Sequence, residues 1–241
     1  MCTICGGAKL GTQALNVFHI STDRGRDYSN LFFRKGSWIA NHRAIPTTEV
    51  ENTEFNQPFG SDYKVVHNGV VANDMELGNV EGVIDSYVLS KVLDFTNIDT
   101  LQESLNKIKG SYALGVMKPN GHFYLACNYK PLFYAGLSTD EFTFSSYEHH
   151  LTDAGYTNVK RLTPYSILDT ETLETREVYR EVHNKVAVIA SAGLDSTAVA
   201  AYAVAKYGPD NVMLIHYQYG AIAQEREVER IAKIADYLQC Q

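Results

Sequence analysis

The sequence predicts an α+β protein in which a layered domain with antiparallel sheets is followed by the beginning of a parallel α/β domain. Up to about residue 175, short apolar strands surround a helical block, which is typical of antiparallel sheets packed against helices. After residue 184, strands and helices alternate singly, which is typical of a parallel sheet. Residues 174–184 between them are charged and polar and are interpreted as a linker. We therefore expect a first domain over residues 2–178 and a second over residues 184–241.

The first domain is expected to consist mostly of short strands. Eight short segments are rich in apolar residues that favour strands, and these residues are either clustered or alternate with polar ones. These segments are residues 15–20, 37–42, 63–66, 111–117, 122–128, 132–135, 141–145 and 165–169. Lys-Pro-Asn-Gly at 118–121 predicts a hairpin turn. Apolar residues at helical spacing predict a helix over 83–95, and a second helix is expected over 101–108.

The second domain is expected to begin with a strand, a helix, a strand and a helix. These elements are predicted at residues 185–190, 196–206, 212–217 and 224–238. A loop of small residues separates the first strand from the first helix. Because parallel strands need a crossover connection, this order predicts a parallel strand pair.

The composition is that of an ordinary globular chain. The 241 residues are 45% hydrophobic and carry a net charge of −7, with 21 basic and 28 acidic side chains. This acidic balance argues against a nucleic-acid groove built by this chain alone. The longest apolar run is about eight residues, too short for a membrane span, and the amino terminus does not resemble a signal peptide. We therefore expect a cytoplasmic protein, in the host cytoplasm if the source is viral, with no membrane partner.

Two cysteines near the amino terminus, Cys2 and Cys5, form a C-x-x-C pair. A structural zinc ion needs four ligands, and the sequence offers no second pair at the required spacing. A redox pair of the thioredoxin type would follow a strand and open a helix. We therefore expect that the pair is neither a zinc site nor a redox pair. We also expect that this fragment binds no zinc and has no metal ligands.

Cys2 has a different potential role as a nucleophile. If Met1 is removed, Cys2 carries both a thiol and a free α-amine that can accept the thiol proton. Arg43 could bind a carboxylate, Asp85 an ammonium group, and Asn68 with Gly69 an oxyanion. Each also has a simpler interpretation: a surface cation for Arg43, a helix-start residue for Asp85, and a type I′ turn for Asn68-Gly69.

Together these residues resemble the class II glutamine amidotransferases, which are N-terminal-nucleophile hydrolases. The resemblance covers about residues 2–175 and rests on a set of short motifs. They are Cys2, Asn41-His42-Arg43-Ala44-Ile45-Pro46-Thr47, Val66-His67-Asn68-Gly69, Ile84-Asp85-Ser86, Ile108-Lys109-Gly110-Ser111-Tyr112-Ala113 and Asn128-Tyr129-Lys130-Pro131-Leu132-Phe133-Tyr134. The resemblance implies an αββα sandwich. It further implies a catalytic set of Cys2, Asn68 and Gly69, and glutamine binding by Arg43, Thr47, His67 and Asp85.

The loop that starts at Ser191 has two interpretations. It could be an ordinary turn between a strand and a helix, with a serine or aspartate cap. Its sequence, Ser191-Ala192-Gly193-Leu194-Asp195-Ser196-Thr197, instead resembles the phosphate loop of the PP-loop ATP pyrophosphatases. That resemblance implies ATP and Mg²⁺ as cofactors, with ATP binding by Ser191, Gly193, Leu194, Asp195, Ser196 and Thr197. Ala192 replaces a glycine of the motif, at a cost of about 1 kcal/mol if the position needs a positive φ.

The residues that follow, His216-Tyr217-Gln218-Tyr219-Gly220, look like those of the 7-cyano-7-deazaguanine synthase branch of that family. The combined resemblance implies a glutamine-dependent amidotransferase that passes ammonia to a PP-loop-bound 7-deazaguanine, converting a nitrile to an amidine as in archaeosine. The expected partners are glutamine, the 7-deazaguanine base or a modified nucleic acid, and a further segment or partner chain that completes the second domain.

Three alternatives remain open. One is an amidotransferase similar to asparagine synthetase, which shares this domain order, and another is a stand-alone glutaminase subunit. The third is a non-catalytic binding or scaffold protein that keeps the fold. Removal of Met1 separates the last alternative from the others, because a retained methionine would block the α-amine.

Overall fold

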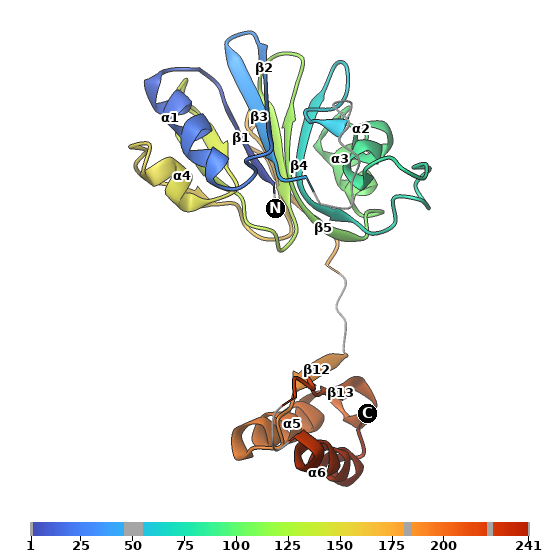
Figure 1. Ribbon diagram of the computed structural model, residues 1–241. Coiled ribbons are helices and arrows are strands. Elements are labelled where there is room, and N and C mark those ends of the chain that lie inside the picture. Colours follow the sequence, from blue (N-terminus) through green and yellow to red (C-terminus); the bar gives the residue numbers. More distant parts are fainter. Residues whose placement is uncertain (1, 46–54, 181–184, 221–223, 241) are drawn as a thin grey trace. The chain divides into compact units, whose positions relative to one another are not determined.

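The structure is a computed structural model that describes residues 2–45, 55–180, 185–220 and 224–240 (Figure 1). The chain divides into two compact units, residues 1–180 and residues 181–241. Within the described residues, no helix is both long and apolar enough to cross a membrane.

The first unit contains two antiparallel sheets. The first sheet has six strands in the order β2 (Tyr28–Arg34), β3 (Ser37–Arg43), β1 (Thr3–Gly7), β8 (Thr143–Ser145), β7 (Phe133–Ala135) and β9 (Lys160–Arg161). The second sheet has five strands in the order β11 (Thr175–Glu177), β10 (Ser166–Asp169), β6 (Phe123–Cys127), β5 (Gly110–Met117) and β4 (Lys64–Val71). The amino-terminal strand β1 is therefore central in the first sheet, and β4 lies at the edge of the second.

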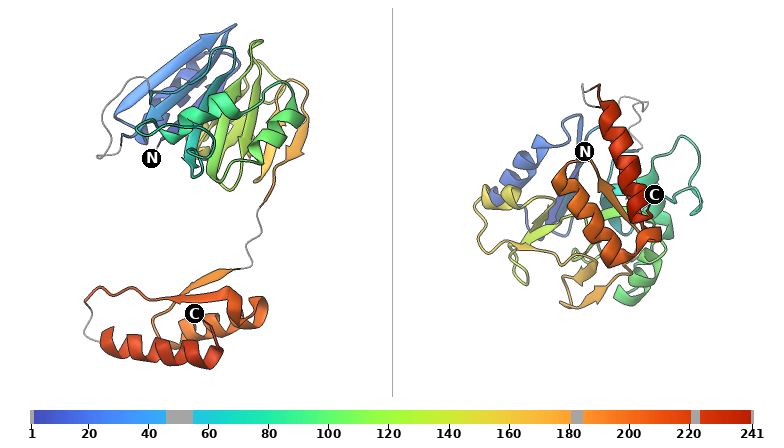
Figure 2. Two further views of the ribbon diagram at one scale, coloured as in Figure 1. Left: turned by 90° about the vertical axis from the view of Figure 1, so that its right-hand side faces the viewer. Right: turned by 90° about the horizontal axis from the view of Figure 1, so that it is seen from below.

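Helices cover the outer faces of both sheets (Figure 1). The first sheet is covered by α1 (Thr12–Ile20), the short helix η1 (Ser21–Asp23) and α4 (Glu148–Thr152). The second sheet is covered by η3 (Asp85–Val88), α2 (Leu89–Val92) and α3 (Ile98–Leu105), which lie in front of its strands in the left view of Figure 2. The first unit thus has four layers, with the two sheets in the middle.

Because both faces of each sheet are covered, the central strands are apolar on both sides. On β5, Leu114 and Val116 pack toward α2 and α3, whereas Ala113 and Met117 pack between the two sheets. Cys5 on β1 belongs to a third apolar cluster, beneath α1 and α4. This double burial explains why the strands read as continuous apolar runs.

The prediction of a strand over residues 15–20 is wrong, because these residues belong to helix α1. Ala14 and Val17, three residues apart, are buried against the first sheet, while Leu15 is exposed. A short apolar run fits the period of a strand and of a helix equally well, and packing against β1 selects the helix.

The strand predicted over residues 63–66 continues much further. Strand β4 runs to Val71, and its residues Asn68 and Gly69 pair with Ala113 and Tyr112 of β5. The type I′ turn interpretation of Asn68-Gly69 is therefore wrong. Pairing along the whole of β5 outweighs the local turn preference of the two residues.

Three other boundaries also differ from the sequence predictions. The helix expected over 83–95 is only η3 and α2 and ends at Val92. The helix expected over 101–108 is α3, which starts at Ile98 because Asn97 and Thr100 form a capping box. Part of the predicted linker is strand β11, which adds to β10 by backbone hydrogen bonds. Sequence analysis did not predict β2, β9 or α4.

The second unit has the predicted order of elements and the predicted parallel pair. It contains β12 (Val186–Ile189), α5 (Leu194–Tyr207), the short helix η4 (Pro209–Asn211), β13 (Val212–Ile215) and α6 (Gln224–Leu238). Strands β12 and β13 pair in parallel, and a small apolar cluster including Val188, Ala200 and Val212 joins them to α5.

Candidate active site

A cavity of about 440 Å³ in the first unit is lined by residues from six separate segments, at positions 2, 43–44, 57, 67–70, 84–86 and 130. The predicted glutamine-site residues that line it are Cys2, Arg43, His67, Asn68, Gly69 and Asp85. Cys2 precedes β1, Arg43 ends β3, the next three lie on β4, and Asp85 begins η3. The fold therefore brings together every described residue that the sequence assigned to glutamine, whereas Thr47 lies outside the described residues.

The two amino-terminal cysteines have different surroundings. Cys2 is partly buried and borders the cavity. Cys5 is fully buried in the cluster beneath α1 and α4, and burial raises the pKa of its thiol to about 12. Cys5 is therefore a packing residue, and only Cys2 of the pair combines access to the cavity with a thiol.

Strand β4 presents Asn68 and Gly69 at the cavity. The side-chain Nδ2 of Asn68 donates to Ser146 Oγ at 3.5 Å, and the same hydroxyl oxygen accepts the backbone N–H of Ile4 at 3.0 Å. At Gly69, a Cβ atom would lie only 1.9 Å from the carbonyl oxygen of Ser111. Glycine is therefore required here by the close approach of β5.

His67 lies on the same strand, and both of its ring nitrogens have protein partners. Nε2 lies 3.2 Å from the carbonyl oxygen of Ser111, and Nδ1 lies 2.8 Å from the Ser86 hydroxyl, which also lies 3.2 Å from Asp85 Oδ1. Burial lowers the pKa of the imidazole, which favours its neutral form. His67 thus joins β4 to η3, next to Asp85.

The two charged residues expected to hold the substrate are both positioned by the protein. Asp85 accepts the backbone N–H of Val71 through Oδ2 at 2.6 Å and the backbone N–H of Ser86 through Oδ1 at 2.7 Å. Arg43 is buried, and its Nη1 donates to Asn56 Oδ1 at 3.4 Å. The cavity therefore has a cation and an anion on its wall, as an amino-acid substrate requires.

Sequence reasoning missed three residues of this site. Gln57 pairs with the backbone of His67 in both directions, accepting at 2.5 Å and donating at 3.1 Å. Lys130 lines the cavity, and Ser146 contacts Asn68. Lys130 falls within a motif quoted for the family resemblance, whereas Gln57 and Ser146 carry no local signal because their contacts are made across the fold.

The predicted ATP residues lie together in the second unit, in the loop between β12 and α5 and the first turn of α5. Ser196 Oγ accepts the N–H of Ser191 at 3.2 Å and donates to the carbonyl of Gly193 at 3.2 Å. Thr197 Oγ1 donates to the same carbonyl at 2.8 Å. Leu194 and Asp195 are exposed. These contacts hold the loop against the start of the helix.

Ala192 in this loop has φ of 57°, in the left-handed region. The sequence comparison with the PP-loop motif placed a glycine at this position, and the backbone explains that preference. Ala192 therefore adopts a backbone conformation that glycine adopts more readily.

Comparison with solved structures shows the fold of the chain. The glutamine phosphoribosylpyrophosphate amidotransferase from B. subtilis, complexed with ADP and GMP, matches with a TM-score of 0.59 and 17% identity. A structure described as the allosteric regulatory enzyme of purine biosynthesis matches with a TM-score of 0.61 and 16% identity. Each match covers 78% of this chain and 51% of the other. At this identity the likeness is one of fold.

Sequence comparison gives a more specific likeness. Residues 185–241 match the family model of the queuosine biosynthesis protein QueC. The chain is 40% identical over 237 residues to 7-cyano-7-deazaguanine synthase 2 of Sulfurisphaera tokodaii, covering 91% of this chain and 51% of that protein. It is 41% identical over 219 residues to 7-cyano-7-deazaguanine synthase of Sulfolobus acidocaldarius, covering 83% of this chain and 47% of that protein. The chain thus spans about half the length of the curated relatives it matches, and the first of these matches extends over both units.

Proposed function

We propose that the first unit is a class II glutamine amidotransferase domain that releases ammonia at Cys2, and that the second unit belongs to a PP-loop domain that uses this ammonia. The observation that carries this proposal is the cavity that gathers Cys2, Arg43, Asn68, Gly69 and Asp85 from four segments of the fold. The four-layered arrangement of the first unit corresponds in this proposal to the αββα sandwich of such domains.

Binding of glutamine uses the two charges on the cavity wall. Arg43 binds the α-carboxylate of the substrate through its planar guanidinium. Asp85 binds the α-ammonium group. Its two oxygens each accept one backbone N–H, and a carboxylate oxygen has a second lone pair to offer.

Cys2 then attacks the side-chain amide carbon of glutamine. Its thiol proton passes to its own α-amine, which is free once Met1 is removed, and the new sulfur–carbon bond places negative charge on the amide oxygen. The side-chain amide of Asn68 and the N–H of Gly69 stabilise this oxyanion. The α-ammonium returns the proton to the leaving nitrogen, ammonia departs, and water hydrolyses the γ-glutamyl thioester to glutamate.

In the second unit, the loop from Ser191 to Thr197 is proposed to bind the phosphates of ATP together with Mg²⁺. A loop of small residues at the start of α5 offers backbone N–H groups to an anion. The relatives are named as 7-cyano-7-deazaguanine synthases. These names favour a 7-deazaguanine as the acceptor of ammonia, with nitrile formation as the reaction.

Conversion of the nitrile to an amidine of the archaeosine type is the second candidate. Amide-¹⁵N-labelled glutamine separates the two in a protein that carries this sequence with a complete second domain. Mass spectrometry finds the label in 7-cyano-7-deazaguanine if the nitrile is formed. It finds the label in an amidine, with 7-cyano-7-deazaguanine consumed, if the second candidate holds.

The glutaminase proposal is tested on this chain by mass spectrometry after treatment with a glutamine-analogue electrophile. We expect a protein without Met1 and one label on Cys2. Cys2→Ala should abolish ammonia release, whereas Cys5→Ala, a substitution in the packed core, should keep most of it. Labelling at Cys127 or Cys240, or equal loss in the two variants, would contradict the proposal.

A further inference from the structure

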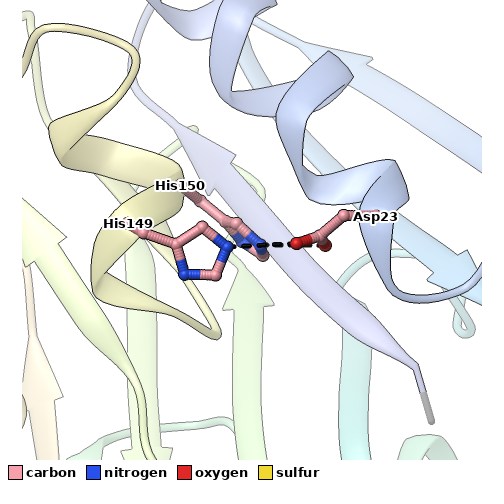
Figure 3. A group of neighbouring side chains, drawn as sticks. All are labelled: Asp23, His149 and His150. Atoms are coloured by element: carbon pink, nitrogen blue, oxygen red, sulfur yellow. Dashed lines mark hydrogen bonds and ion pairs between the residues drawn. The ribbon is translucent and has the colours of Figure 1, made fainter.

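Three side chains that the glutaminase mechanism does not use converge on the helix-covered side of the first sheet (Figure 3). Asp23 ends η1, and His149 and His150 lie in α4, more than 120 residues later. The Nε2 atom of His149 lies 3.0 Å from Asp23 Oδ2, and the Nε2 atom of His150 lies 3.1 Å from Asp23 Oδ1. All three ligand atoms lie within 4.8 Å of one another.

One of the three side chains is buried and hydrogen-bonded, and the other two are accessible to solvent. The side chain of His150 is fully buried, and its Nδ1 is hydrogen-bonded to Ser145 Oγ at 2.8 Å and to Ser21 Oγ at 3.2 Å. The side chains of His149 and Asp23 are 48% and 40% exposed. A metal site needs this combination, because outer partners orient the ligands while an open side admits the ion.

We propose that Asp23, His149 and His150 bind a divalent transition-metal ion of the Zn²⁺ class, with water completing its coordination. Two imidazole nitrogens and a carboxylate are ligands that Zn²⁺ accepts, at about 2.0–2.1 Å, which sets neighbouring ligand atoms about 3.3 Å apart in a tetrahedron. The separations of 3.0 and 3.1 Å are to the two different oxygens of Asp23, and one ligand atom from each of the three residues lies within 4.8 Å of the others, so the side chains would have to shift to reach this spacing.

The serine hydroxyls allow His150 to change tautomer when the ion enters. Without metal, Nε2 donates its proton to Asp23 and Nδ1 accepts from a serine hydroxyl. With metal, Nε2 offers its lone pair, the proton sits on Nδ1, and the serine hydroxyl becomes the acceptor. His150 therefore stays hydrogen-bonded in both states.

The guanidinium of Arg24 lies close to the group. Arg24 follows Asp23 directly, but its guanidinium is held over the ring of Tyr147 at 4.7 Å and donates to the Tyr147 hydroxyl. The carboxylate of Asp23 therefore faces the two imidazoles. An ion bound there would link η1 to α4 on the outside of the first sheet.

Calorimetric titration with ZnCl₂ tests the site on the purified chain, with Co²⁺ as a spectroscopic probe of the coordination. We expect one ion per chain and a visible absorption band of bound Co²⁺. His149→Ala and Asp23→Asn should each lower the affinity by about tenfold or more. His122→Ala, which removes an exposed histidine outside the group, should leave the affinity unchanged.

A second measurement separates binding from misfolding. Zn²⁺ should raise the melting temperature of the wild-type chain and of His122→Ala but not of the double variant Asp23→Asn/His149→Ala. The variant sites are partly exposed, so the metal-free variants should keep the wild-type circular dichroism spectrum. Absence of stoichiometric binding overturns the proposal. The proposal is also overturned if the double variant still binds Zn²⁺. It is overturned as well if Cys2→Ala loses Zn²⁺ binding while His149→Ala keeps it.

Discussion

The side-chain amide of Asn68 lies 3.5 Å from the hydroxyl oxygen of Ser146, so a residue of β4 in one sheet is joined to the segment that follows β8 in the other. Ser146 is fully buried and is itself held by the backbone N–H of Ile4, two residues from Cys2. The amide that we propose as an oxyanion donor is therefore oriented by Ser146, which is held in turn by the strand that follows the nucleophile.

Asn68→Ala should lower kcat for glutamine hydrolysis by about 100-fold or more, because one oxyanion donor is removed. The KM for glutamine should change little, since the amide is proposed to act on charge that develops in the transition state. Steady-state ammonia release measures both constants. Ser146→Ala, which removes the orienting contact and the acceptor of the Ile4 N–H but no oxyanion donor, should lower kcat less. A rise in KM alone for Asn68→Ala would contradict the oxyanion role.

Arg43→Lys should raise the KM for glutamine by about tenfold or more, because an ammonium group cannot replace a planar guanidinium that binds a carboxylate at two points. Arg26→Lys is the matched control, since Arg26 is exposed and lies outside the cavity. Kinetics over a range of glutamine concentrations give the comparison. Equal KM values for the two variants would remove Arg43 from the substrate site.

Gly69→Ala should destabilise the first unit by about 3 kcal/mol, as overpacking between two paired strands does. The new Cβ would lie 1.9 Å from the Ser111 carbonyl oxygen, and backbone atoms cannot move aside cheaply. Gly11→Ala is the control, because a Cβ at Gly11 meets no atom within 4 Å. Denaturant unfolding of both variants measures the difference, and equal stability would mean that β4 and β5 are further apart than described.

Ala192→Gly should stabilise the second unit by about 0.5–1 kcal/mol, because it relieves a left-handed alanine with φ of 57°. Ala198→Gly, at an exposed position in α5, should destabilise it by about 1 kcal/mol through loss of helix propensity. Amide hydrogen exchange in residues 185–240 measures both changes. If both substitutions changed the stability in the same direction, Ala192 would not have the left-handed conformation described here.

His42 should make the first unit less stable in acid. Burial lowers the pKa of His42 to about 4, and the backbone of Phe18 opposes this shift in part. Between about pH 6.5 and pH 4 the unfolded chain binds a proton that folded His42 does not, so the free energy of unfolding falls as pH falls, by about 1.4 kcal/mol per pH unit. His42→Gln should flatten this dependence in denaturant unfolding at several pH values, and an unchanged slope would assign it to other groups.

Much of the local structure could be predicted because it is encoded in short windows. The hairpin between β5 and β6 has its turn residues at 118–121, and strand and helix alternate in the second unit with their usual periods. The residue types of the candidate site could also be identified in the sequence. A thiol, a guanidinium and a carboxylate are groups that can attack and bind an amino-acid amide. The sequence by itself thus determined the order of most elements and the chemistry available.

Only the tertiary structure decided which residues meet. Residues 15–20 became part of a helix because the first sheet offers a face for Ala14 and Val17, and Asn68-Gly69 stayed in a strand because β5 pairs with both. Asp23 meets His149 and His150 across more than 120 residues, which no spacing in the sequence can signal. The physical reason is the same in each case: long-range packing and strand pairing contribute more free energy than local preference, and they depend on partners far away along the chain.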